Sequence, residues 1–254
     1  MIPAVNTRKT PGLLASVRSL PEAEIALAAG VDIIDLKEPA HGALGAVSHA
    51  VARDVVHMVD GAVRVSATIG DDLHGDRRRT AEAVRAMAAT GVDIVKVGLF
   101  DEAERAELLS ALAPLAASGI RIVAVLLVDR GLRLEVEDVA AAGLYGAMLD
   151  TACKASGSLT QLLSADQIRT FPEACRHAPR RLLCGLAGSL RLEDIAAVSR
   201  GGPDYLGFRG ALCHDGARVG QLSGQRVAAV CAALREHAVS IDGESPPLQA
   251  AGGA

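Results

Sequence analysis

The chain has 254 residues, half of them hydrophobic, and a formal net charge of −4 at pH 7. It has no basic block and only five aromatic residues, which argues against nucleic acid as a partner. Residues 1–10 do not resemble a signal peptide, and the longest apolar run, 122–128, is too short to cross a bilayer. We therefore expect a cytoplasmic protein without a membrane partner.

The five cysteines are widely scattered, and neither a Cys pair nor a Cys/His cluster has the spacing of a zinc site. We expect no bound metal. The thiols are interpreted as reduced and mostly buried, as in a reducing compartment.

In chain order, short apolar segments alternate with segments of helical character. Strands are expected at 13–17, 31–37, 64–69, 92–99, 120–128, 145–150, 181–186 and 204–208, the second of them stopped by Pro39. Helices are expected at 21–29, 48–59, 76–89, 102–117, 135–142, 159–175, 192–199 and 219–236. Residues 1–238 form these units, whereas the Gly-, Pro- and Ala-rich tail, 239–254, is expected to be disordered.

Three of these units repeat one pattern, in which a helix-ending Gly leads through an Asp into a strand, at 29–35, 90–96 and 201–207. Repetition of one strand–helix unit predicts a single (β/α)8 TIM barrel of the phosphate-binding type. The alternative is an open, doubly wound sheet, but the G-x-G-x-x-G turn that often marks such a sheet is absent.

The second predicted strand carries two opposite charges near its end. Side chains alternate along a strand, so Asp35 and Lys37 share one face. Burying either charge alone costs several kcal/mol, roughly, and we expect both to be paired or to face a wet pocket.

Only four of the 26 basic residues are lysines, and Lys37, Lys96 and Lys154 lie at or just past predicted strand ends. In a barrel these ends share one rim, where active sites lie. Lysine can deprotonate whereas arginine cannot, and clustered ammonium groups lower one another's pKa. The pattern predicts a lysine nucleophile that forms a Schiff base, with Asp35 or Asp150 moving protons. The alternative is structural ion pairing, of Lys37 with Asp35 and of the other two lysines with Asp150.

Two short loops are candidates for binding an anion. Gly188-Ser189 follows the seventh predicted strand and Arg209-Gly210 the eighth. Backbone N–H groups of these two loops commonly hold phosphate in phosphosugar barrels, although Gly-Ser is also an ordinary turn. Asp71, after the third strand, either caps the next helix or touches substrate.

Six motifs together resemble those of the (5-formylfuran-3-yl)methyl phosphate synthase family, the first enzyme of the methanofuran pathway. They occur in order between about residues 13 and 234, and they are 32–39 with Gly42 and Gly45, 66–71, 93–99, 149–154, 186–190 and 207–213.

The resemblance implies condensation of two molecules of glyceraldehyde 3-phosphate to a furan aldehyde phosphate, with loss of water and one phosphate. It assigns Lys37 to the Schiff base, Lys96 to proton transfer, and Asp150 and Lys154 to the remaining catalytic positions. No cofactor is expected, because an iminium ion already serves as the electron sink. The expected partners are the small-molecule substrate and further copies of the chain in a homo-oligomer. The chain departs from the family at 126–130, and what this strand contributes is left open.

Two other functions fit the same residues. One is a different Schiff-base aldolase or phosphosugar lyase on the same barrel. The other is a non-catalytic phosphosugar-binding barrel, which would leave the three lysines unexplained.

Overall fold

A computed structural model describes residues 10–73, 75–153 and 156–243. Its parallel strands pair in sequence order, and β1 pairs with β8 to close a barrel. The strands are β1 Gly12–Val17, β2 Ile33–Leu36, β3 Arg64–Thr68, β4 Ile94–Leu99, β5 Ile122–Leu127, β6 Gly146–Asp150, β7 Leu183–Leu186 and β8 Tyr205–Phe208. The α-helices are α1 Leu20–Ala28, α2 His49–Val59, α3 Arg77–Ala88, α4 Arg105–Ala117, α5 Glu137–Ala141, α6 Leu159–Leu162, α7 Ala165–His177, α8 Ile195–Ser199 and α9 Gly224–Gly243.

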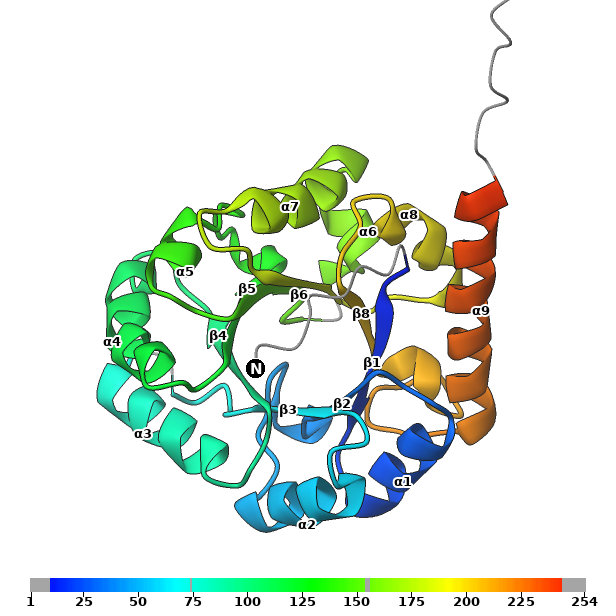
Figure 1. Ribbon diagram of the computed structural model, residues 1–254, viewed down its shortest axis with the longest axis horizontal. Helices are drawn as coiled ribbons and strands as arrows, with labels where there is room; N and C mark the ends of the chain where they lie inside the picture. The colour runs from blue at the N-terminus through cyan, green and yellow to red at the C-terminus, as the bar shows by residue number, and fades with distance from the viewer. Residues whose placement is uncertain (1–9, 74, 154–155, 244–254) are drawn as a thin grey trace, which may run out of the picture.

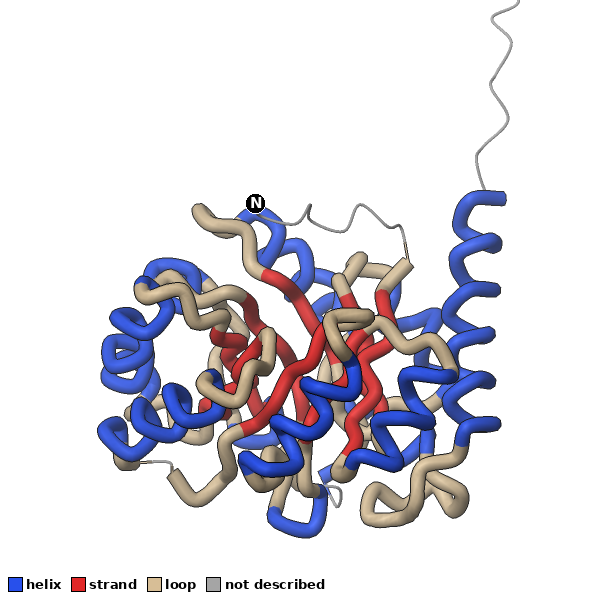
Figure 2. Tube along the Cα trace, turned by 60° about the horizontal axis from the view of Figure 1, so that its bottom comes forward, coloured by secondary structure: helices blue, strands red, loops and turns tan. Residues whose placement is uncertain are grey.

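The helices form an outer layer around the strands (Figures 1 and 2). Alternate strand residues therefore serve two separate cores. Leu13 and Ala15 face the helices in the larger core, whereas Leu14 points into the barrel, where it packs with Met148 and Tyr205. Burial of both strand faces explains the nearly continuous apolar runs. The predicted (β/α)8 barrel is confirmed.

The repeated aspartate fastens neighbouring strands at the amino-terminal end of the barrel. The carboxylates of Asp32, Asp93 and Asp204 accept hydrogen bonds from the N–H groups of Leu13, Val65 and Cys184, at 2.8, 2.9 and 2.7 Å. Each aspartate N–H in turn donates to the carbonyl oxygen of the same partner. The repeated aspartate thus joins the backbones of neighbouring strands where their pairing begins, at the opposite end of the barrel from the lysines.

The predicted helix at 159–175 is wrong as a continuous element, because α6 and α7 are separate. Leu163 is extended, and Ser164 begins α7 through a capping box with Gln167. The last helix begins at Gly224 rather than 219, because the chain before it folds back in a bridge between Cys213 and Leu222.

Helix α9 continues to Gly243, beyond the predicted domain boundary at 238, and residues 244–254 lie outside the described part of the chain. Among the described helices, none is long and apolar enough to cross a membrane.

Replacing Asp93 by alanine is expected to lower the free energy of unfolding by about 1 kcal/mol, because the Val65 N–H loses its acceptor at a site that water reaches. Urea denaturation measures this loss. Catalytic rate constants should stay unchanged, and a large loss of kcat would contradict a purely structural role for this end of the barrel.

Candidate active site

A cavity of about 740 Å³ opens at the carboxyl ends of the strands. This volume is within the usual range for small-molecule sites. Seven of the nine predicted site residues line it, namely Lys37, Lys96, Asp150, Gly188, Ser189, Arg209 and Gly210. The structure thus brings together residues from strands and loops far apart in the sequence.

Asp35 lies beneath this cavity at the centre of a buried polar network. Its carboxylate accepts hydrogen bonds from the Ser16 hydroxyl at 2.9 Å and the Ser66 hydroxyl at 2.7 Å. The Lys96 ammonium group donates to it at 2.7 Å. The strand register sets Ser16 beside Asp35 and Asp35 beside Ser66, which makes this convergence possible. Asp35 is 0% and Lys96 1% exposed, so both charges depend on these partners.

The network shifts the pKa of both charged groups. Burial by itself raises the pKa of Asp35, but the nearby Lys96 and Lys37 charges and the hydrogen bonds outweigh it, and the pKa lies below its ordinary value. Burial is the largest influence on Lys96 and lowers its pKa, with the Lys37 charge acting in the same direction. Lys96 therefore releases a proton more readily than a surface lysine.

The ion pairs differ from those considered for the sequence. Lys37 lies 3.6 Å from the Asp150 carboxylate rather than pairing with Asp35, and Lys96 pairs with Asp35 rather than with Asp150. Lys37, Lys96 and Asp150 all line the cavity. Lys37 and Asp150 are slightly exposed, whereas the side chains of Lys96 and Asp35 are almost fully buried. Lys154 lies outside the described residues.

The loop after β7 turns sharply at the cavity wall. Gly188 has a φ of 107°, and a Cβ added there would come within 2.9 Å of the Thr151 methyl group. Ser189 has a φ of 53°, which non-glycine residues adopt only at a cost. Strained backbone of this kind is common where main-chain groups meet a ligand.

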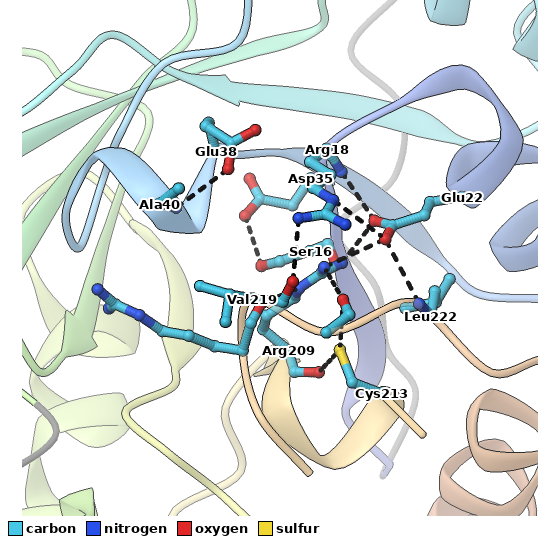
Figure 3. Close-up of polar contacts among 12 residues, drawn as sticks. Ser16, Arg18, Glu22, Asp35, Glu38, Ala40, Arg209, Cys213, Val219 and Leu222 are labelled. Atoms are coloured by element: carbon cyan, nitrogen blue, oxygen red, sulfur yellow. Dashed lines mark hydrogen bonds and ion pairs between the residues drawn. The ribbon is translucent and has the colours of Figure 1, made fainter. Parts of the chain in front are cut away.

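The guanidinium group of Arg209 is fully engaged by the protein. It pairs with Glu22 at 2.6 Å and donates to the carbonyl oxygen of Ser16 (Figure 3). It also donates to the carbonyl oxygens of Arg218 and Gly220. These contacts occupy all five of its N–H donors. Its side chain therefore has a different role from the predicted contact with phosphate, and only the backbone of 209–210 remains a candidate for that contact.

Several residues of the site were not identified as such in the sequence. Ser16 is a polar residue within an apolar strand, a pattern that signals a partner inside the barrel. Glu22 lies in the first turn of α1, where acidic residues are common, and that position does not reveal its burial against Arg209. Arg218 and Arg226 line the cavity, but nothing in their sequence context distinguishes them from other surface arginines.

Comparison with known proteins identifies the family of this chain. The model of the 4-HFC-P synthase family matches residues 13–231. The chain belongs to this family. A Methylorubrum extorquens protein, provisionally named (5-formylfuran-3-yl)methyl phosphate synthase, is 44% identical over 89% of this chain and 92% of its own. The synthase of that name from Methanopyrus kandleri is 36% identical over 82% of this chain and 92% of its own.

Solved structures bear on the fold alone. Phosphoribosyl anthranilate isomerase from Thermus thermophilus superposes with a TM-score of 0.64 at 15% identity, covering 89% of this chain and 98% of its own. Family membership therefore rests on sequence, and the barrel is a shared architecture.

Replacing Asp35 by asparagine is expected to lower the free energy of unfolding at pH 7 by about 3–5 kcal/mol, because the Lys96 ammonium group then lies buried without a counter-charge. The folded-state pKa of Asp35 is below its unfolded value, so its contribution is complete above about pH 4 and is lost as the pH falls through the folded-state pKa. The difference between wild type and variant in urea denaturation should therefore shrink below about pH 4. A difference that stays constant with pH would contradict this assignment.

Proposed function

We propose that this protein condenses two molecules of glyceraldehyde 3-phosphate into (5-formylfuran-3-yl)methyl phosphate through a Schiff base on Lys37. The observation that carries the proposal is the position of Lys37. Its ammonium group lines the cavity beside Asp150 and acts electrostatically on the buried Lys96. An amine with a carboxylate partner at the mouth of a barrel is suited to attack an aldehyde.

In this mechanism the Lys37 amine adds to the aldehyde carbon of the first triose phosphate, and water leaves as the imine forms. The iminium ion makes the proton on the adjacent carbon acidic, and its loss expels the phosphate from the third carbon of the same triose. The second triose phosphate, as its enol, then forms a bond from its second carbon to that third carbon. The hydroxyl oxygen of the first triose closes the ring on the aldehyde carbon of the second, two water molecules leave, and hydrolysis of the iminium ion returns the free amine.

Proton transfer in these steps is assigned to Asp150, Lys96 and Lys154. Asp150 is close enough to Lys37 to accept and return protons at the amine nitrogen. Lys96, with its lowered pKa, is suited to exchange protons between Asp35 and the cavity. Lys154 is included on the family resemblance.

The retained phosphate is assigned to the main chain of Gly188, Ser189 and Gly210, which line the same cavity. Arg218 and Arg226 add positive charge to its wall. We further propose that the product enters methanofuran-type cofactor biosynthesis, that the enzyme is a carbon–oxygen lyase acting on phosphates, and that it works in the cytoplasm as a homo-oligomer.

Borohydride trapping tests the Schiff base directly. Incubation with glyceraldehyde 3-phosphate and sodium borohydride, followed by peptide mass spectrometry, should give an irreversible adduct on Lys37. The matched variant Lys37→Arg keeps the cation beside Asp150 but cannot form an imine. It should give no adduct and lose kcat by at least about 10³-fold.

The other outcomes are equally informative. An adduct on Lys96 would keep the reaction class and overturn the assignment of roles. Formation of furan aldehyde phosphate without any trapped adduct would refute the imine. An adduct on Lys37 with a different product would indicate another aldolase.

Replacing Gly188 by alanine tests the phosphate loop. The new methyl group would collide with Thr151, so the loop must move, and the KM for glyceraldehyde 3-phosphate should rise about tenfold. The control is Gly61→Ala, which has a φ of 74° but open space around its Cβ. Both variants lose stability from the positive φ, by about 1–2 kcal/mol. If both raise KM equally, the loop has no specific role.

A further inference from the structure

The loop that follows Lys37 is held by a dense set of hydrogen bonds. Gly45 accepts from the Glu38 N–H at 2.8 Å, which closes the loop on itself, and from the Thr68 hydroxyl at 2.9 Å. The Gly70 N–H donates to the Leu44 carbonyl oxygen at 3.1 Å. The segment is therefore fixed to the end of β3 and is poorly suited to act as a mobile lid.

Asp71 makes the strongest of these attachments. Its two carboxylate oxygens each accept a backbone hydrogen bond, from the Ala43 and Leu44 N–H groups, both at 2.7 Å. Gly42 allows this approach, since a Cβ there would lie 2.2 Å from an Asp71 carboxylate oxygen. The sequence left open whether Asp71 caps the next helix, but Asp76 caps α3 instead.

Asp129 likewise accepts two backbone hydrogen bonds, from the loop that follows Asp150. It lies in the turn after β5, η2 Val128–Arg130, and its two oxygens accept from the Ala152 and Cys153 N–H groups at 2.7 and 2.8 Å. Partial burial acts to raise the pKa of Asp129, but the two N–H donors outweigh it and hold the pKa below its ordinary value. The segment 126–130, whose contribution the sequence left open, thus supplies a carboxylate that holds a neighbouring loop.

Each carboxylate follows the strand next to the one whose loop it holds. Asp71 comes after β3, which pairs with β2, and Asp129 comes after β5, which pairs with β6. Each carboxylate accepts hydrogen bonds from two consecutive amides, which lie six and seven residues after Lys37 in one loop and two and three residues after Asp150 in the other. Lys37 and Asp150 are the two partners of the ion pair in the cavity. A shift of about 1 Å in a reacting group can lower the rate about 10²-fold.

We propose that Asp71 and Asp129 are positioning residues, which hold the loops after β2 and β6 so that Lys37 and Asp150 meet in reactive geometry. This rests on the proposed function in that Lys37 and Asp150 are taken as the reacting pair. Neither aspartate is assigned a contact with substrate.

Amide hydrogen exchange tests the grip without reference to any substrate. In Asp71→Asn the amide NH2 group faces one of the two N–H donors, so exchange at Ala43 and Leu44 should rise about tenfold or more. In Asp129→Asn the same rise should occur at Ala152 and Cys153. Unchanged exchange at these amides would overturn the proposal.

Steady-state kinetics with glyceraldehyde 3-phosphate test the consequence. Both Asn variants should lose kcat by about 10²-fold with little change in KM, because substrate binding is left intact. Asp71→Glu and Asp129→Glu, which keep the carboxylate, should recover part of kcat. The matched control is Asp93→Asn, which weakens the same kind of carboxylate-to-amide contact at the opposite end of the barrel and should keep kcat.

A double-mutant cycle separates positioning from general damage. Gly42→Ala displaces Asp71 without changing any charge and, at a φ of 109°, also strains the same loop, so it should lose at least as much kcat as Asp71→Asn. Because both changes break one contact, the double variant should lose hardly more than Gly42→Ala alone. Additive losses, or an equal loss in Asp93→Asn, would overturn the positioning role. Absence of turnover in the wild type would refute the proposed substrate, and the exchange experiment would still decide whether each aspartate holds its loop.

Discussion

The ion pair between Asp35 and Lys96 is the constraint around which the barrel interior is organised. Two charges with almost no contact with solvent are tolerated only if every strong donor and acceptor is satisfied. The hydroxyl groups of Ser16 and Ser66, on the strands on either side of β2, donate hydrogen bonds to the Asp35 carboxylate. A slip of one residue between β1, β2 and β3 would turn a serine away and leave the carboxylate short of a donor. The polar network therefore specifies the register that the apolar interior alone would leave less strictly defined.

The same pair separates two kinds of charge at the carboxyl ends of the strands. Lys96 reaches the cavity wall but is almost fully buried and has a lowered pKa, whereas Lys37 and Asp150 are more exposed to the cavity. A buried ammonium group next to a reactive amine changes the electrostatics of the site without occupying the space a substrate needs. This arrangement suits chemistry in which one lysine acts as the nucleophile while another transfers protons.

Much of this was accessible from the sequence, for physical reasons. Alternating elements and the repeated Gly-to-Asp pattern predict the barrel, and scarce lysines at strand ends indicate the cavity. The choice of ion-pair partners could not be predicted, because alternation along a strand shows which face Lys37 occupies but not which residue lies across the barrel. The break between α6 and α7 could have been predicted, since Ser164 and Gln167 have the spacing of a capping box. That the protein occupies every N–H donor of Arg209 could not be predicted from the sequence, because its partner Glu22 is 187 positions away.

That separation has a consequence for how the protein is made. The chain up to β6 already carries Lys37, Lys96 and Asp150, yet Glu22 meets its guanidinium partner only after β8 has formed, and the backbone acceptors of Arg209 extend to Gly220. During synthesis on the ribosome, Glu22 of α1 therefore lacks its guanidinium partner until nearly the whole barrel has emerged. Closure of the ring and completion of the cavity wall are therefore a single late event, and shortened chains that contain every proposed reacting side chain of the described part would still lack a finished site.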